Sequence, residues 1–347
     1  MAAPHPTVLD YPYATPPAPA EAQEVAPHVL WIRMPLPFAL DHINLWLLRE
    51  DDGFTLVDCG YGDAATRELW ARHFDSTLRG EPIVRIVATH CHPDHLGNAA
   101  WLARRFGCTV TMTQAEYLAA HAIIDERATF GVHDTCALFR AHGLEEEHLA
   151  ALEARGNRYK RGVPEAPSRF DRVLAGDVIA AGRHAWRVIP GFGHSPEHAA
   201  LHAPSAGVLI SGDMLLPKIT TNVAVWPSEP DADPLARFLA SLTAFETLPP
   251  DSLVLPSHGL PFRGIALRIA YLRAHHAARL DELHAALAAA GTPQSAAAMV
   301  PVLFRRSLDL QQRYFAMGEA IAHLNHLWRA GRVSRDTAAD GAIRFAA

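Results

Sequence analysis

The 347-residue chain is poor in cysteine and lysine, and it has no long apolar run. Its four cysteines show no paired spacing, which favours a reduced compartment over a disulfide framework. No stretch of about eighteen apolar residues occurs, so no membrane-spanning helix is expected. The N-terminal segment lacks a basic start followed by an apolar run and does not resemble a secretory signal. These absences predict a cytoplasmic protein without a membrane partner.

Negative charge exceeds positive charge over the whole chain, which has a net charge of −6. A protein of this charge is not expected to have a general affinity for nucleic acid. Residues 262–347 differ from the remainder because they carry 11 Arg against 6 Asp and Glu. A local basic face in this C-terminal region therefore stays open as an alternative.

Short apolar runs separated by turn residues fill the first 260 residues and predict layered α/β architecture. Residues 1–25 are rich in proline and predict an extended surface arm, 26–260 a catalytic domain, and 261–347 a helical C-terminal domain. Residues 113–170 are expected to form a helical insertion. The expected strands are 29–33, 43–49, 54–57, 83–89, 108–112, 172–174, 184–189, 199–202, 207–210 and 253–255. The expected helices are 63–74, with Asp63 as cap, 93–106, 234–245, 265–290, 295–304 and 310–330, before a short hairpin through 343–345.

Three histidines and one aspartate lie close together in residues 89–95, Thr-His-Cys-His-Pro-Asp-His. The segment stands where an apolar strand ends and a helix begins. Side chains two apart on a strand point the same way, so His90 and His92 can bind one ion. The following turn brings Asp94 and His95 to the other side of the same pocket, where a second ion can bind. Imidazole and carboxylate groups are suitable zinc ligands.

Three further candidates each follow an apolar strand and have a glycine nearby, namely His194, Asp213 and His258. Taken singly, each has a structural explanation, because Asp213 could shape a turn and His258 could be a core histidine. A lone His-x-His pair is also usually structural. Loops at one rim of a sandwich can nevertheless converge, and the seven residues together predict a metal site. Cys91 is interpreted as small filler between ligands.

This array resembles the metallo-β-lactamase superfamily, whose signature is His-x-His-x-Asp-His followed by a single His, Asp and His. The turn Asp58-Cys59-Gly60 matches the Asp-x-Gly turn of the same family, and the resemblance spans residues 29–259. It implies an α+β fold, a four-layer αββα sandwich with the helical insertion 113–170 and the C-terminal helical domain. It also implies two zinc ions per chain, with iron or manganese as alternatives. By this resemblance His90, His92 and His194 hold the first ion, Asp94, His95 and His258 hold the second, Asp213 bridges them and Asp58 orients the ligands.

Two ions about 3.5–4 Å apart can share a water and supply hydroxide at neutral pH. Asp94 is the natural group to orient that water and carry its proton, which makes it the candidate catalytic residue. Family β-lactamases place Cys or Ser at the position of Asp213, which disfavours antibiotic hydrolysis. Diiron members that reduce oxygen place Glu at the position of His92, which disfavours that branch too. Glyoxalase II-like thioesterases, lactonases and ribonucleases share the full ligand set.

Two regions outside the signature bear on the substrate. Residues 320–327 and 331–333 resemble a winged-helix-like cap, which could bind RNA, pack on the catalytic domain or form a homodimer. The insertion could be a lid over the metals or a helical pair that extends the core. His198 could support a ligand or simply pack in the core. Candidate pocket residues are Tyr117, Phe130, Phe139 and Tyr159 of the insertion, together with Met214, Asn222 and Trp226.

The sequence thus predicts a dizinc hydrolase in which a bridging hydroxide attacks a small activated carbonyl substrate, a thioester or an ester or lactone. One alternative is a ribonuclease or phosphodiesterase of the same fold. A second is a mononuclear-iron persulfide dioxygenase, which shows the same signature. The expected partner is a small molecule, and nucleic acid is disfavoured.

Overall fold

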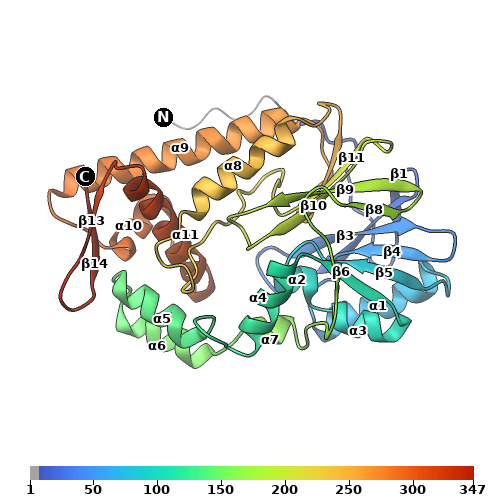
Figure 1. Ribbon diagram of the computed structural model, residues 1–347, viewed down its shortest axis with the longest axis horizontal. Helices are drawn as coiled ribbons and strands as arrows, with labels where there is room; N and C mark the ends of the chain where they lie inside the picture. The colour runs from blue at the N-terminus through green and yellow to red at the C-terminus, as the bar shows by residue number, and fades with distance from the viewer. Residues whose placement is uncertain (1–7) are drawn as a thin grey trace.

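Two β-sheets pack face to face in the computed structural model, which describes residues 8–347 (Figure 1). Residues 1–7 of the expected N-terminal arm lie outside the described residues. The seven-stranded sheet has the order β1-β2-β3-β4-β5-β6-β7, and the five-stranded sheet has the order β12-β11-β10-β9-β8. The first comprises β1 (Gln23–Ala26), β2 (Val29–Pro35), β3 (His42–Arg49), β4 (Phe54–Val57), β5 (Ile83–Val87), β6 (Thr109–Met112) and β7 (Asp171–Arg172). The second comprises β8 (Val178–Ala181), β9 (His184–Gly191), β10 (His198–Ala203), β11 (Val208–Gly212) and β12 (Leu253–Pro256).

Alternating side chains divide the apolar residues of the strands between an inner and an outer core. In β11, Val208 and Ile210 join the core between the sheets, whereas Leu209 joins the core beneath the helices. Strand geometry requires this alternation, because successive side chains point to opposite faces. Helices α1 (Ala64–Ser76) and α3 (Ala99–Phe106) cover the larger sheet, and α8 (Pro234–Glu246) and α9 (Ile265–Ala290) cover the smaller one. The predicted four-layer αββα sandwich is therefore confirmed.

The expected helix 93–106 is wrong as one element, because α2 (Pro93–Leu96) and α3 are separated at Gly97 and Asn98. A Cβ on Gly97 would lie 2.4 Å from the carbonyl oxygen of Gly162, so the backbone approaches the insertion closely there. The Asn98 side chain donates a hydrogen bond of 2.7 Å to the carbonyl of Tyr61. Both contacts come from distant parts of the chain, which explains why local periodicity does not reveal the break.

Other expected boundaries need smaller corrections. The strand expected at 83–89 ends at Val87, because the Thr89 amide donates to the Asp58 carboxylate rather than to a neighbouring strand. The strand expected at 172–174 is only the two-residue β7, and β1 and β8 were not expected. The expected cap at Asp63 is confirmed, since its carboxylate accepts from the Thr66 amide.

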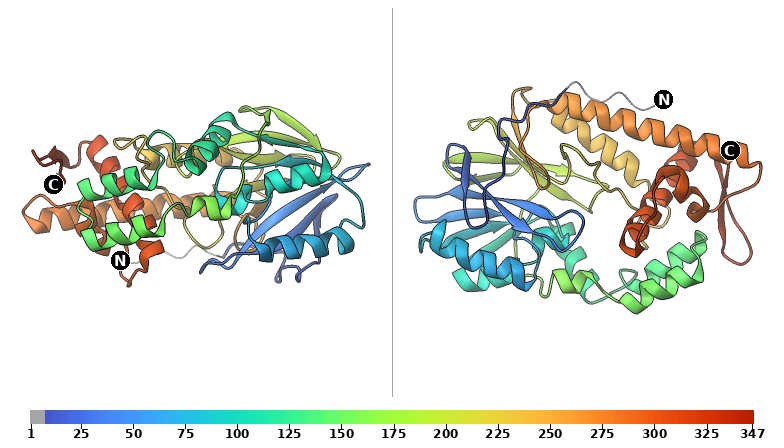
Figure 2. Two further views of the ribbon diagram at one scale, coloured as in Figure 1. Left: turned by 90° about the horizontal axis from the view of Figure 1, so that it is seen from below. Right: turned by 180° about the vertical axis from the view of Figure 1, so that it is seen from behind.

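The insertion and the C-terminal region pack on each other at one end of the sandwich (Figures 1 and 2). Helices α5 (Val132–Ala141) and α6 (Glu146–Arg155) share the core of the C-terminal helices through residues such as Phe139 and Leu149. None of the helices in residues 8–347 is long and apolar enough to cross a membrane. The insertion contains α4 (Gln114–Ile124), α5 (Val132–Ala141), α6 (Glu146–Arg155) and α7 (Tyr159–Gly162). After α9 follow α10 (Ala296–Leu303), α11 (Leu310–Arg329) and the expected hairpin of β13 (Ser334–Thr337) and β14 (Ile343–Ala346).

Candidate metal centre

The strand ends of both sheets bring all seven candidate ligands together at one rim of the sandwich. The segment after β5 carries the first four, and the ends of β9, β11 and β12 carry His194, Asp213 and His258. Their donor atoms form two groups, each within 4.8 Å. One group is His90, His92, His194 and Asp213, and the other is Asp94, His95 and His258.

The first group is a compact set of three imidazoles and one carboxylate. His90 Nε2 lies 2.9 Å from His92 Nδ1 and 3.3 Å from His194 Nε2. His194 Nε2 lies 3.2 Å from Asp213 Oδ2. Four tetrahedral ligands at about 2.0–2.1 Å from zinc lie about 3.3–3.4 Å apart, so these spacings fit one ion. Burial and the neighbouring His194 lower the pKa of His92 to about 3, which keeps its lone pair free.

The second group uses the other oxygen of Asp213. Asp213 Oδ1 lies 3.6 Å from His95 Nε2 and 3.5 Å from His258 Nε2. Asp94 Oδ2 lies 3.3 Å from His258 Nε2 and 3.7 Å from His95 Nε2. One carboxylate therefore presents Oδ2 to the first group and Oδ1 to the second, which is the arrangement that a bridging ligand requires.

Two buried atoms at the second group, His95 Nε2 and the Asp213 Oδ1 that faces it, have no hydrogen-bond partner within residues 8–347. A buried polar atom without a partner is costly unless something else satisfies it. Burial opposes protonation of His95, but Asp58, Asp94 and Asp213 outweigh it and raise its pKa to about 10. The surroundings of this ring thus favour a positive charge, and a divalent cation fits both the donors and the field.

The ring nitrogens that face away from the centre are fixed by acceptors outside it. His194 Nδ1 donates to the carbonyl of Asn222 at 2.7 Å, and His258 Nδ1 donates to the carbonyl of His42 at 2.8 Å. A proton on Nδ1 leaves Nε2 free to bind a metal, so these contacts select the required tautomer. His95 Nδ1 makes the corresponding contact with Asp58 Oδ2 at 2.8 Å.

Asp58 lies behind His95, as the resemblance implies. Its carboxylate also accepts from the Thr89 amide at 2.8 Å and from the Thr89 hydroxyl at 2.9 Å. Asp58 itself adopts φ +62°, a conformation that costs most residues free energy and that Asp tolerates better than most. This turn directs the Asp58 carboxylate at both the Thr89 backbone and the His95 ring.

His198 contacts the backbone of Asp213, which favours a supporting role for this ring over simple packing. Its Nε2 accepts from the Asp213 amide at 3.2 Å. Burial lowers its pKa well below the usual value, so the ring is neutral and can accept. Gly212 has φ +52°, and a Cβ there would lie 2.2 Å from His198 Nε2. Only glycine lets the chain turn into Asp213 beside this ring.

Glu116 was missed by the sequence analysis, although it ties two ligand loops together. This fully buried residue of α4 accepts from the Cys91 amide at 2.9 Å. It also accepts from the Ser195 hydroxyl and the Glu197 amide, both at 2.6 Å. A glutamate in an ordinary helical pattern gives no local signal of these contacts, which depend on the tertiary fold.

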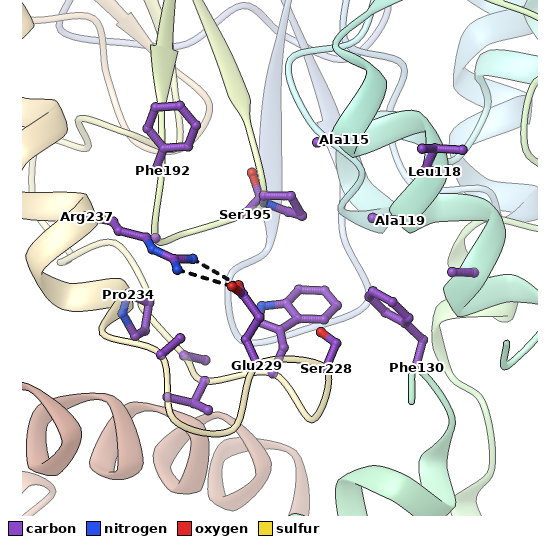
Figure 3. A pocket seen from close by; sticks show the side chains of 17 residues that line it. Ala115, Leu118, Ala119, Phe130, Phe192, Ser195, Ser228, Glu229, Pro234 and Arg237 are labelled. Atoms are coloured by element: carbon purple, nitrogen blue, oxygen red, sulfur yellow. Dashed lines mark hydrogen bonds and ion pairs between the residues drawn. The ribbon is translucent and has the colours of Figure 1, made fainter. Parts of the chain in front are cut away.

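A largely apolar cavity of about 350 Å³ lies next to the loop that carries His194 (Figure 3). Its walls come from α4, from Phe130 and Trp226, and from the loop residues Phe192 and Ser195. An ion pair between Arg237 and Glu229 closes one side. Helix α4 of the insertion therefore forms one wall of this cavity, whereas α5 and α6 extend the core of the C-terminal helices.

The remaining candidate pocket residues have other roles. Tyr159 donates to the Cys91 carbonyl at 2.5 Å, and Phe139 packs against Tyr314 in the C-terminal core. Tyr117 stacks on Phe170 at 4.1 Å. Met214 is wholly buried, and Asn222 lies behind His194 instead of in the cavity wall. Of the seven candidates, only Phe130 and Trp226 line the cavity.

Two family models match the chain. The model described as the metallo-beta-lactamase superfamily matches residues 39–258. The model described as the metallo-beta-lactamase-like C-terminal domain matches residues 280–347. The first match covers more than half of the chain and contains all seven candidate ligands.

Individual proteins agree with these matches. A beta-lactamase domain protein from Burkholderia ambifaria is 50% identical, with a TM-score of 0.90 over 97% of this chain and 98% of that one. The metallo-beta-lactamase family protein TTHA1429 from Thermus thermophilus is 28% identical, with a TM-score of 0.78 over 93% of this chain and 99% of that one. The probable metallo-hydrolase YqjP of Bacillus subtilis (strain 168) is 24% identical over 266 residues, 68% of this chain and 73% of that protein.

Proposed function

Because the chain belongs to the metallo-β-lactamase superfamily, we propose that it is a metal-dependent hydrolase of small thioesters or other activated esters, lactones included. The proposed cofactor is a pair of zinc ions. The proposal of two metal ions rests on Asp213, because its two carboxylate oxygens face two separate ligand groups. If only the first group bound a metal ion, the two buried atoms at the second group would remain without any partner.

When bound, two such ions lower the pKa of a water and polarise the carbonyl of the substrate. The chain itself supplies the proton acceptor. Asp94 is the most exposed carboxylate of the group, with 18% of its side chain accessible against 11% for Asp213. Burial opposes ionisation of Asp94, but His95 and His258 outweigh it and lower its pKa. The ionised carboxylate is therefore suited to orient a water and accept its proton.

The apolar cavity beside His194 supports a substrate with an acyl or aromatic group. Alanines of α4, together with Phe130, Trp226 and Phe192, offer contact area with few groups to bind a charged ligand. The charged residues that line the cavity are Glu229 and Arg237, and these two form an ion pair with each other at 2.9 Å. An apolar group of the substrate would leave water there at roughly 0.8 kcal/mol per methylene.

The ribonuclease alternative needs free arginines in the C-terminal region, and the relevant ones are engaged. Arg329 donates to the Asp231 carbonyl, Arg335 pairs with the Asp231 carboxylate, and Arg332 pairs with Asp281. The third helix of a winged helix usually contacts the nucleic acid. Here half of the residues of the third C-terminal helix, α11, are buried, and they lie between Ala316 and Leu327. These contacts support the small-substrate function over the RNA-cleaving one.

The test combines metal analysis with a series of acyl thioesters of increasing chain length. We expect two zinc ions per chain and a kcat/KM that rises roughly fourfold per added methylene until the cavity is filled. Ala119→Leu narrows the α4 wall and should shorten the preferred chain, whereas the control Ala119→Ser should not. One iron per chain would support the dioxygenase instead, and efficient cleavage of single-stranded RNA with no thioesterase activity would support the ribonuclease.

A further inference from the structure

The loop between Asp213 and Asn222 is held by helices that lie outside residues 39–258. Arg268 of α9 is fully buried and donates to the carbonyls of Leu216 and Ile219, at 2.5 and 2.6 Å. Because the buried guanidinium of Arg268 donates to both carbonyls, it fixes the path of the loop between Asp213 and Asn222. The loop begins at the bridging aspartate, so its position matters to the metal centre.

A second helix, α11, holds the far end of the same loop through Glu319. The Asn222 side chain donates to Glu319 Oε2 at 3.2 Å. The backbone carbonyl of Asn222 is the acceptor that fixes His194 Nδ1 at 2.7 Å. A chain of two hydrogen bonds therefore runs from the C-terminal helix to a ligand of the first metal group.

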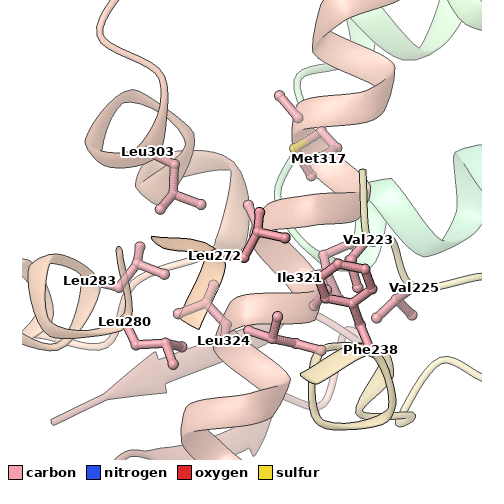
Figure 4. Close-up of a cluster of buried hydrophobic side chains, with 14 of the residues drawn as sticks. Val223, Val225, Phe238, Leu272, Leu280, Leu283, Leu303, Met317, Ile321 and Leu324 are labelled. Carbon is pink, nitrogen blue, oxygen red and sulfur yellow. The ribbon is translucent and has the colours of Figure 1, made fainter. Parts of the chain in front are cut away.

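Close packing brings α11 against the residues that follow Asn222 (Figure 4). The Val225 amide donates to the carbonyl of Gly318 at 3.2 Å. A Cβ on Gly318 would lie 2.8 Å from the Cβ of Ala224, so a larger residue would push the helix away. Val223 and Val225 belong to the same apolar core as Ile321 of α11.

The Glu319 side chain is half-buried, and its carboxyl is directed at Asn222. Burial raises its pKa to about 7, and the Asn222 hydrogen bond only partly opposes this. Within residues 8–347 it has no other hydrogen-bond partner and no ion-pair partner. This single contact places the Glu319 carboxyl to hold the Asn222 side chain.

We propose that Glu319 is a positioning residue that, through Asn222, fixes the His194 ring for metal binding and makes α11 part of the metal centre. The inference rests on the proposed metal centre but not on the proposed substrate. It assigns the C-terminal region a direct task, which is to complete the support of one ligand. Partners of metal ligands typically contribute 10- to 100-fold to metal affinity or activity.

The test compares Glu319→Leu, which removes the acceptor, with Glu319→Gln, whose amide oxygen can still accept. We expect Glu319→Leu to weaken metal binding roughly 10- to 100-fold and to change the visible spectrum of the cobalt-substituted protein. Glu319→Gln should restore both. Asn222→Ala keeps the backbone carbonyl but breaks the same contact, so Glu319→Leu with Asn222→Ala should bind metal no more weakly than the worse single variant.

Asn325→Leu is the matched control for helix damage. Asn325 lies fully buried on α11 and donates to the carbonyls of Pro230 and Ala232, away from Asn222. This variant should lower the melting temperature without weakening metal binding to the folded protein. If Glu319→Leu does not fold, Asn222→Ala provides the same comparison. Unchanged metal affinity and spectrum in Glu319→Leu or Asn222→Ala, or an equal loss in Glu319→Gln, would overturn the proposal. These measurements use no substrate, so their outcome does not depend on whether the protein hydrolyses thioesters.

Discussion

Asp58 contacts a ligand of the second candidate group, and Glu319 is proposed to support a ligand of the first, but the two residues come from different regions of the molecule. Asp58 follows β4 inside the sandwich and makes contacts with Thr89 and His95, within 37 residues along the chain. Glu319 belongs to the C-terminal helix α11 and reaches Asn222 across 97 residues. One support is built into the sheet, and the other depends on how a separate helical region is docked.

The comparison shows that the two halves have different sources of rigidity. The sandwich half is fixed by a carboxylate that accepts from a backbone amide, a hydroxyl and a ring nitrogen. His194 is instead held by the Asn222 carbonyl, and Asn222 belongs to a loop that contacts α11 through Glu319 and Gly318 and contacts α9 through Arg268. Changes in the helical region should therefore act on His194, and changes in the sandwich should act on His95.

Asp213→Ala should have the largest effect, because it removes the one group shared by both halves. Each oxygen faces a different ligand group, so in the proposed two-ion site the variant would lose a contact to both ions at once. We expect metal affinity to fall by more than the roughly 100-fold upper range for partners of ligands. Metal content after dialysis against a chelator measures this. Near-normal occupancy and turnover would mean that Asp213 only shapes the turn.

Asp58→Ala should come second and act on the sandwich half. It leaves the buried Thr89 amide without its partner, which costs about 1–3 kcal/mol of unfolding free energy. It also frees His95 Nδ1, for which we expect a roughly 10- to 100-fold loss of metal affinity. Chemical denaturation and a zinc titration separate the two effects. Wild-type affinity in this variant would contradict an orienting role.

Gly318→Ala should break the C-terminal half with a smaller effect. In most helices this change stabilises by about 0.5–1 kcal/mol. Here the added Cβ meets Ala224 at 2.8 Å and should displace α11 from Asn222. We expect a several-fold loss of metal affinity, less than in Glu319→Leu. Adding Ala224→Gly removes the opposing methyl group and should restore binding, and failure of this rescue would argue against the packing explanation.

The triple variant Arg329→Ala, Arg332→Ala, Arg335→Ala should have the smallest effect on activity. These side chains contact Asp231 and Asp281 at the periphery of the helical region. Exposed pairs such as that of Arg332 contribute about 0–1 kcal/mol each, so the expected fall in melting temperature comes mainly from Arg335, whose side chain is only 9% exposed and lies over Trp328. Thioester hydrolysis across a salt series measures activity. A loss of RNA cleavage in this variant, with a steep salt dependence in the wild type, would favour the nucleic-acid function.

Sequence reasoning located the sandwich and brought the seven candidate ligands to one rim, because both depend on local pattern. Apolar strands that end in His194, Asp213 or His258 can be recognised one at a time. Their assignment as ligands stays a prediction. Glu116 and Glu319 escaped detection because each lies in an ordinary helix and gains its role from residues far along the chain. The break at Gly97 escaped for the same reason, since its cause is a carbonyl in the insertion.

The order in which the chain is synthesised has a consequence for metal binding. Glu319 follows His194 by 125 residues, and chains are synthesised from the N-terminus at about 5–20 residues per second. His194 therefore leaves the ribosome about 6–25 s before the helix that steadies it. If Glu319 acts as proposed, the growing chain carries a ligand set that binds metal weakly, and tight uptake begins only when α11 docks. Metal affinity should then rise roughly 10- to 100-fold once the C-terminal region has folded, so a chain interrupted within it would hold its metal more weakly.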